Sequence, residues 1–149
     1  MIRIFLDANI YFSAARSLQG GSAIVLEFAK KGRVELFATS AVLKEAERNL
    51  RLKEKVLVLI RHYGNLKLAK PKIVKISGRR AKEKLKLIIN EKDALILAGA
   101  EKAKADYLVT LDKKHFFAEK VGLAKLPFEI ITPGHLIERL VADLRNSSR

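Results

Sequence analysis

Short apolar runs and amphipathic stretches alternate along the chain. Residues 2–6 are apolar except for Arg3 and predict a short buried strand, whereas residues 23–31 have the apolar spacing of a helix with one face toward a core. The same order, a strand and then a helix, recurs at 34–38 and 41–51. This repetition is typical of an α/β fold.

The rest of the chain continues the alternation. A helix is predicted at 53–63, a strand at 73–76 and a segment that is basic on one face at 79–89. A helix at 92–104 and a strand at 107–111 follow, then a turn or short helix from 113, a strand at 128–131 and a last helix at 132–144. Gly64 and Asn65 are expected to end the first of these helices. Strands joined by helices form a mostly parallel sheet covered on both faces, so we predict a three-layer sandwich.

The composition suits a folded protein of one domain over residues 1–149, with 49% hydrophobic and 31% charged residues. No apolar run approaches the roughly 18 residues of a membrane-spanning helix, and the N-terminus has no signal-peptide layout. We therefore expect a cytoplasmic protein without a membrane segment. The absence of cysteine leaves only oxygen atoms and the three histidines as metal ligands.

Positive charge is in large excess. Thirty Lys and Arg residues against sixteen Asp and Glu give a net charge of +14, which favours a polyanionic partner such as nucleic acid, or an acidic protein. A composition rich in Lys and Glu is also typical of thermophiles, but thermophily does not account for the excess of positive over negative charge.

Four carboxylates are expected at one edge of the sheet. Asp7 and Asp112 each follow a predicted strand, and ligands of open α/β sheets bind outside the carboxyl ends of the strands. The helix that begins near Asp93 runs roughly 18 Å away from this edge, and the next strand returns over a similar distance. Asp93 and Asp112 are therefore expected at the same edge of the sheet. Glu45 lies early in the helix that follows the strand ending at Ala38, close to the same edge.

Such a group of acids needs neutralisation, either by basic side chains or by a divalent cation. Oxygen ligands favour Mg²⁺ or Mn²⁺. Asp7 is then a metal ligand, and Asn9 a neutral donor that orients Asp7 or the substrate. Taken singly, each acid also has a plainer interpretation: Asp7 as a turn residue, Asp93 as a helix cap, and Glu45, like its neighbour Glu47, as helix surface.

Four segments resemble successive blocks of the PIN domain, the fold of VapC toxin ribonucleases and related RNA-processing nucleases. The segments are LDANIYFSA, TSAVLKEAERNL, NEKDALILAGAEKAKADYLVTLDKKHF and EIITPGHLI, and together they cover nearly the whole chain in order. The resemblance implies a parallel sheet flanked by helices and an endoribonuclease that depends on Mg²⁺ or Mn²⁺. The family's acidic quartet matches Asp7, Glu45, Asp93 and Asp112.

Polar positions beside the acids match as well, at Asn9, Ser40 and Thr110. His115 is a departure, because many members have another acid three residues after the last one. The histidine at this position predicts either a lower metal affinity or a contact between His115 and phosphate. Alternatively, His115 is a surface residue without a role in the site.

We therefore predict that Asp7, Asp93 and Asp112, with Glu45 directly or through water, hold one or two metal ions that activate a water for in-line attack on RNA. Surrounding cations would hold the RNA backbone. The predicted RNA-binding residues are Arg79, Arg80, Lys82, Lys113 and Lys114. The cluster near Arg79 is alternatively a solvated face. Resemblance to the toxins also implies an antitoxin partner and a homodimer.

Two other functions fit parts of the pattern. A phosphatase or phosphoacceptor domain also places an Asp after its first strand, but it needs a second Asp two residues on or an adjoining acidic pair, and here that position is Asn9. A non-catalytic PIN-fold module could bind RNA or a protein through its basic surface. Cleavage that a chelator removes would distinguish the nuclease from this module.

Overall fold

Five parallel strands form the centre of the fold in the computed structural model, which describes residues 1–85, 90–118, 121–122 and 124–147. The strands are β1 (Arg3–Leu6), β2 (Glu35–Ala38), β3 (Lys72–Ile73), β4 (Tyr107–Val109) and β5 (Glu129–Ile131). Their order in the sheet is β3-β2-β1-β4-β5, and every neighbouring pair is parallel. This confirms the α/β prediction and places β1 at the centre.

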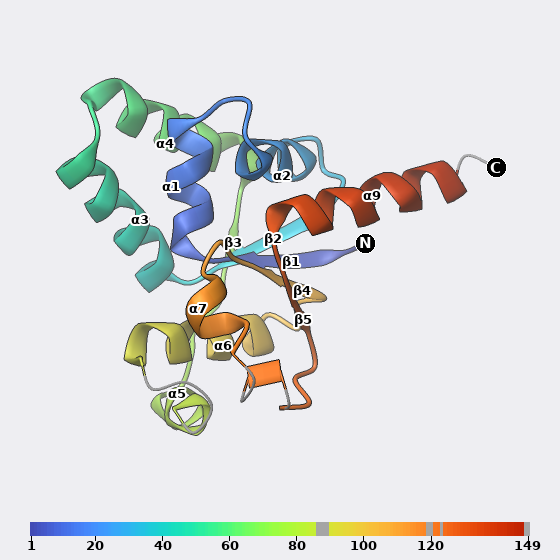
Figure 1. Cartoon of the computed structure of the whole chain (residues 1–149). Coiled ribbons are helices and arrows are strands. Elements are labelled where there is room, and N and C mark those ends of the chain that lie inside the picture. The colour runs from blue at the N-terminus through green and yellow to red at the C-terminus, as the bar shows by residue number, and fades with distance from the viewer. Residues whose placement is uncertain (86–89, 119–120, 123, 148–149) are drawn as a thin grey trace.

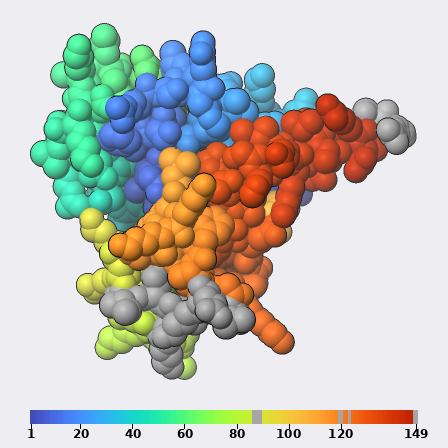
Figure 2. Space-filling model, in the orientation of Figure 1, coloured from blue at the N-terminus to red at the C-terminus, as the bar shows by residue number. Residues whose placement is uncertain are grey.

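Helices cover both faces of the sheet (Figure 1). On one side lie α1 (Ala8–Arg16), α2 (Gly21–Lys30), α3 (Ser40–Lys53), α4 (Val56–Ala69) and α9 (Pro133–Ser147). On the other side lie α5 (Gly78–Lys84), α6 (Glu91–Lys102) and the short α7 (Lys113–Phe116). Figure 2 shows α9, in red, lying against the blue α2. The predicted three layers are thus present.

Close packing of α6 on β1 positions the start of that helix. Ile4, Phe5 and Leu6 of β1 are fully buried, and Gly99 of α6 lies against the ring of Phe5. A Cβ added at Gly99 would lie 2.6 Å from Cζ of Phe5, so no larger residue fits there without a shift. Because α6 can approach β1 this closely, its first turn, with Asp93, reaches the carboxyl edge of the sheet.

The structure adds a helix that the apolar pattern did not predict. α1 begins at Ala8, directly after β1, and Asp7 is its N-cap, with a side-chain oxygen 2.7 Å from the backbone N–H of Ala8. The predicted break at Gly64 and Asn65 is wrong, since α4 runs on to Ala69. Buried Asn65 accepts a hydrogen bond from Nζ of Lys30 at 2.8 Å, and this contact outweighs the weak helix propensity of an exposed glycine.

The remaining differences concern element ends. α3 continues to Lys53, so the helix predicted at 53–63 begins later, at Val56. The basic segment predicted at 79–89 is helical in α5, and its residues 86–89 lie outside the described part of the chain. Within the described residues, no helix has both the length and the hydropathy to cross a membrane.

Candidate active site

A cavity of about 480 Å³ opens at the carboxyl edge of β1 and β4, and residues of α1, α3 and α6 line it. All four predicted carboxylates line it: Asp7, Glu45, Asp93 and Asp112. They come from positions up to 105 residues apart in the sequence, and the sheet topology brings them together. Asp7 follows β1, Asp112 follows β4, and Asp93 lies in the first turn of α6.

Asp7 is buried and held by three donors. Oγ1 of Thr110 donates to its Oδ2 at 2.7 Å, Nδ2 of Asn9 donates to the same oxygen at 3.2 Å, and the N–H of Ala8 donates to Oδ1. The pKa of Asp7 is raised to about 6, mainly by burial and in smaller part by the charges of Asp93 and Asp112, although the hydrogen bonds from Thr110 and Ala8 oppose the shift. The carboxylate is therefore fixed in place, but the hydrogen bonds stabilise its negative charge by less than burial destabilises it.

Thr110 joins this acid to the next one. Besides donating to Asp7, its Oγ1 accepts the backbone N–H of Asp112 at 3.0 Å. Oδ1 of Asn9 accepts the N–H of Leu111 at 3.3 Å, so Asn9 also spans the two strand ends. Of the three polar residues predicted beside the acids, Thr110 and Asn9 contact Asp7. Ser40 is exposed and outside the described cavity lining, where Thr39, the N-cap of α3, lies instead.

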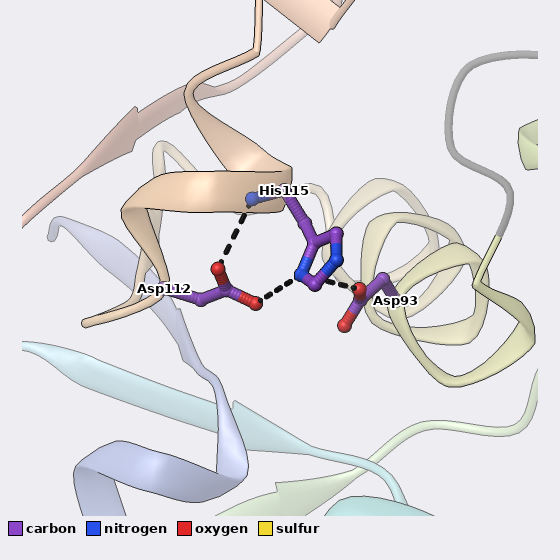
Figure 3. A group of neighbouring side chains, drawn as sticks. All are labelled: Asp93, Asp112 and His115. Carbon is purple, nitrogen blue, oxygen red and sulfur yellow. Dashed lines mark hydrogen bonds and ion pairs between the residues drawn. The ribbon is translucent and has the colours of Figure 1, made fainter.

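Asp93, Asp112 and His115 form a compact group (Figure 3). Nδ1 of His115 lies 2.9 Å from Oδ2 of Asp112 and 3.5 Å from Oδ2 of Asp93, and the N–H of His115 donates to Oδ1 of Asp112 at 3.1 Å. Asp93 is only 8% exposed, and its Oδ2 receives no hydrogen bond from the described residues. A buried oxygen without a donor is costly unless a cation or water binds it.

The protonation of this group differs from one acid to the next. Burial raises the pKa of Asp93, and the charge of Asp112 adds to the effect. Burial also acts to raise the pKa of Asp112, but the hydrogen bonds from the ring and backbone of His115 outweigh it and lower the pKa. His115 therefore already stabilises the charge of Asp112, whereas Asp93 has a weaker partner.

Glu45 differs from the other acids because cations hold it at the cavity wall. Nζ of Lys92 lies 3.0 Å from its Oε1, Arg48 forms an ion pair with Oε2, and Asn49 donates to Oε1 at 3.4 Å. The hydrogen bond from Lys92, against the effect of burial, lowers the pKa of Glu45. This acid stays charged over the physiological pH range.

Three cations that the sequence reading missed line the cavity: Arg48, Lys53 and Lys92. A signal for two of them was present, because Arg48 follows Glu45 by three residues on one helix face and Lys92 precedes Asp93. They place positive charge around the acids, where a phosphodiester backbone would lie.

The predicted basic residues lie elsewhere. Arg79 forms an ion pair with Glu83 at 3.8 Å and Arg80 pairs with Glu101 at 2.7 Å, so each already has an acidic partner. Arg79 and exposed Lys82 line a separate surface hollow on α5. Lys113 and Lys114 are exposed on α7, directly after Asp112. Contact of these five residues with RNA stays a prediction, and Lys113 and Lys114 are the best placed for it.

Comparison with known proteins agrees with this geometry. Among solved structures, the chain is similar to a chain of VapBC2 from Rickettsia felis, determined bound to a DNA fragment from its promoter. The TM-score is 0.62 and the identity 22%, covering 88% of this chain and 98% of that one, which shows a shared fold. No curated protein sequence matches the chain. A family model described as PIN domain matches residues 3–114, and the chain therefore belongs to the PIN domain family.

Proposed function

We propose that this protein is an endoribonuclease that uses Mg²⁺ or Mn²⁺ to hydrolyse RNA phosphodiester bonds. The observation that carries the proposal is buried Asp93, whose Oδ2 has no hydrogen-bond donor in the described part of the chain while Asp7 and Asp112 line the same cavity. Three acids so placed repel one another unless a cation lies among them. Membership of the PIN domain family supports a nuclease.

The residues present fit a divalent ion. Asp93 and Asp112 would hold it, with Asp7 beside them and Glu45 reaching it directly or through water, and these oxygen donors suit Mg²⁺ or Mn²⁺. When bound, the ion supplies a Lewis acid that acidifies water and offsets negative charge on a phosphate. The raised pKa values of Asp7 and Asp93 support this, because buried carboxylates gain most from a nearby cation.

The chain's own residues would position the acids and the RNA. Thr110 and Asn9 hold Asp7 on the end of a rigid strand, so this carboxylate needs little reorganisation on binding. Arg48, Lys53 and Lys92 at the cavity would bind the phosphodiester backbone and direct one bond toward the acids. Among the described lining residues, Phe12 is the one aromatic side chain, so the cavity offers cations for the RNA backbone and little surface for base stacking. This supports cleavage with weak sequence preference.

Cleavage of defined RNAs tests the proposal. The purified protein should cut with Mg²⁺ or Mn²⁺, stop when a chelator is added, and lose cleavage in Asp93→Asn while its circular dichroism spectrum is unchanged. Asp143→Asn, at an exposed acid on α9, is the matched control and should cut like the wild type. Metal-dependent cleavage at the wild-type rate by Asp93→Asn would falsify the assignment.

A non-catalytic RNA- or protein-binding module is the second candidate. One observation favours it: Lys92 and Arg48 already neutralise Glu45, and His115 contacts Asp112, so the acids are partly compensated without a metal. RNA binding without cleavage under every metal condition would support the module and contradict the nuclease.

We also propose that the chain is the toxin of a toxin–antitoxin pair and forms a homodimer. The fold shared with VapBC2 supports the pair. The product of an adjacent gene should inhibit cleavage.

An exposed apolar patch supports the homodimer. Large apolar side chains are exposed where α3 meets α4, at Leu52, Val56, Leu57 and Ile60, and such a patch is typical of a protein interface. Light scattering should give the mass of a dimer for the wild type and of a monomer for Leu57→Glu; a wild-type monomer at all concentrations would contradict the homodimer.

A further inference from the structure

We propose that His115 is a direct ligand of the bound metal, and that its imidazole gives the site a preference for first-row transition ions, Mn²⁺ among them, over Mg²⁺. The inference rests on the metal site of the proposed function and goes beyond it by naming the nitrogen donor and the class of ion. It concerns the position three residues after Asp112, where His115 stands and where many proteins of the resembled family have another acid.

The spacing of the donor atoms fits a shared ion. One ligand atom from each of Asp93, Asp112 and His115 can be chosen so that all three lie within 4.8 Å of one another. Two ligands about 2.1 Å from one ion are about 3.0 Å apart when they subtend a right angle, and about 3.4 Å apart at a tetrahedral angle. Nδ1 of His115 is 2.9 Å from Oδ2 of Asp112 and 3.5 Å from Oδ2 of Asp93, so small side-chain movements would let all three bind.

The buried acid gives independent support. Asp93 is only 8% exposed, and its Oδ2 faces Nδ1 of His115 at 3.5 Å (Figure 3). This oxygen has no hydrogen-bond donor among the described residues. Folding leaves such an atom unsatisfied only at a cost, and a cation in this place would remove that cost. The unsatisfied atom is one of the three proposed ligands, so the position of the ion follows from the acid as well as from the histidine.

The short helix α7 keeps the imidazole in position. Asp112 is the N-cap of α7 and accepts the backbone N–H of His115, so one residue supplies a ligand and fixes the turn that carries the other. The side chain of His115 is 42% exposed, which leaves the ring room to move by the few tenths of an ångström required. Buried Phe116 anchors the same helix in the core.

Nitrogen donors change the selectivity of an oxygen site. Mg²⁺ prefers oxygen ligands and keeps its waters, whereas imidazole binds first-row transition ions with an affinity that rises along the series from Mn²⁺. A carboxylate oxygen at position 115 would discriminate less between Mg²⁺ and the transition ions than an imidazole nitrogen does. His115 should therefore raise the affinity for Mn²⁺ relative to Mg²⁺, and raise that for Co²⁺ more.

Calorimetry and Mn²⁺ spin-echo spectroscopy test the inference without an activity assay. Titration of wild type, His115→Gln, His115→Asp and Asp93→Asn with Mn²⁺ and with Mg²⁺ gives the ratio of the two dissociation constants. We expect both His115 variants to reduce the preference for Mn²⁺ by at least about tenfold, and Asp93→Asn to weaken binding of both ions. In the wild type, bound Mn²⁺ should show the ¹⁴N modulation of a directly coordinated imidazole.

His135 offers the matched control, because its side chain is exposed at the start of α9. His135→Gln should keep both the modulation and the wild-type preference, and His115→Gln should lose both. Wild-type Mn²⁺ binding without imidazole modulation, or an unchanged ion preference in both His115 variants, overturns the inference and leaves the proposed nuclease standing. If neither ion binds the wild type, both fail. The modulation experiment needs no variant, so it decides the question even if His115→Gln misfolds.

Discussion

The hydroxyl of Thr110 lies 2.7 Å from Oδ2 of Asp7, and both side chains are buried. Oγ1 of Thr110 also accepts the N–H of Asp112, so a single side chain sets the positions of two acids that follow different strands. Geometry at the site therefore depends on a residue that need not touch metal or RNA itself.

Thr110→Val should disturb the site more than the fold. The variant leaves Asp7 without its strongest hydrogen bond and the N–H of Asp112 without an acceptor, while the volume is nearly kept. We expect Mn²⁺ affinity to fall about 10- to 100-fold, the range for loss of an outer-shell partner, and unfolding free energy to fall by about 1–3 kcal/mol. Calorimetry and urea unfolding measure the two effects. Thr110→Ser keeps the hydroxyl and should lie close to the wild type; equal losses in both variants would contradict the hydrogen-bond account.

Asp7→Asn should stabilise the metal-free protein at neutral and higher pH. The pKa of Asp7 is raised from 3.8 to about 6 in the folded state, so the unfolded chain loses this proton first as the pH rises. Ionisation therefore reduces stability progressively between pH 3.8 and about 6, and the full loss persists above that range. Removing the charge should recover on the order of 1–3 kcal/mol at pH 8 and nothing at pH 3.

Urea unfolding in the presence of a chelator measures this difference. A gain for Asp7→Asn that is the same at both pH values would show that packing or a new hydrogen bond is responsible and not the buried charge. Added Mn²⁺ should reverse the order of stability, because the wild type alone keeps its full set of ligands.

Gly99→Ala and Gly64→Ala form a pair that tests how α6 is positioned. A Cβ at Gly99 would meet Cζ of Phe5 at 2.6 Å, whereas nothing lies within 4 Å of one at Gly64. Both glycines are inside helices, so alanine adds about 1 kcal/mol of helix propensity in each. We expect Gly64→Ala to stabilise, and Gly99→Ala to destabilise by about 1–3 kcal/mol because overpacking outweighs propensity. Thermal unfolding separates them. Stabilisation by both would mean that α6 can move away from β1 freely.

Much of the architecture follows from the order of apolar runs. The strand ends that carry Asp7 and Asp112 were predictable, since parallel strands joined by helices leave their carboxyl ends at one edge. The direction of α6 likewise placed Asp93. α1 was missed because Asp7 was interpreted as a strand end and a ligand, although an Asp before the apolar residues Ile10, Tyr11, Ala14 and Ala15 is also a helix N-cap signal.

Other features depend on contacts that a linear pattern does not encode. α4 passes through Gly64 because Asn65 meets Lys30 from another helix. The basic residues near Arg79 looked like the densest RNA surface, yet Glu83 and Glu101 pair with them, and Glu101 belongs to a different helix. The direction of the His115 ring depends on a side-chain rotamer, which residue spacing leaves open.

Lys92→Met and Arg79→Met compare the two candidate RNA surfaces at equal loss of charge. Lys92 lines the acidic cavity, where it would exchange its ion pair with Glu45 for one with an RNA phosphate. Arg79 lies on α5, outside the described cavity lining. In an Asp93→Asn background, which prevents cleavage, we expect Lys92→Met to weaken RNA binding and to reduce the salt dependence of log K by about one. Arg79→Met should change both quantities less. Fluorescence anisotropy at several salt concentrations measures both quantities. The opposite result, a smaller salt slope for Arg79→Met alone, would place the RNA backbone along α5 and away from the acids, and a nuclease could not act on a strand bound there.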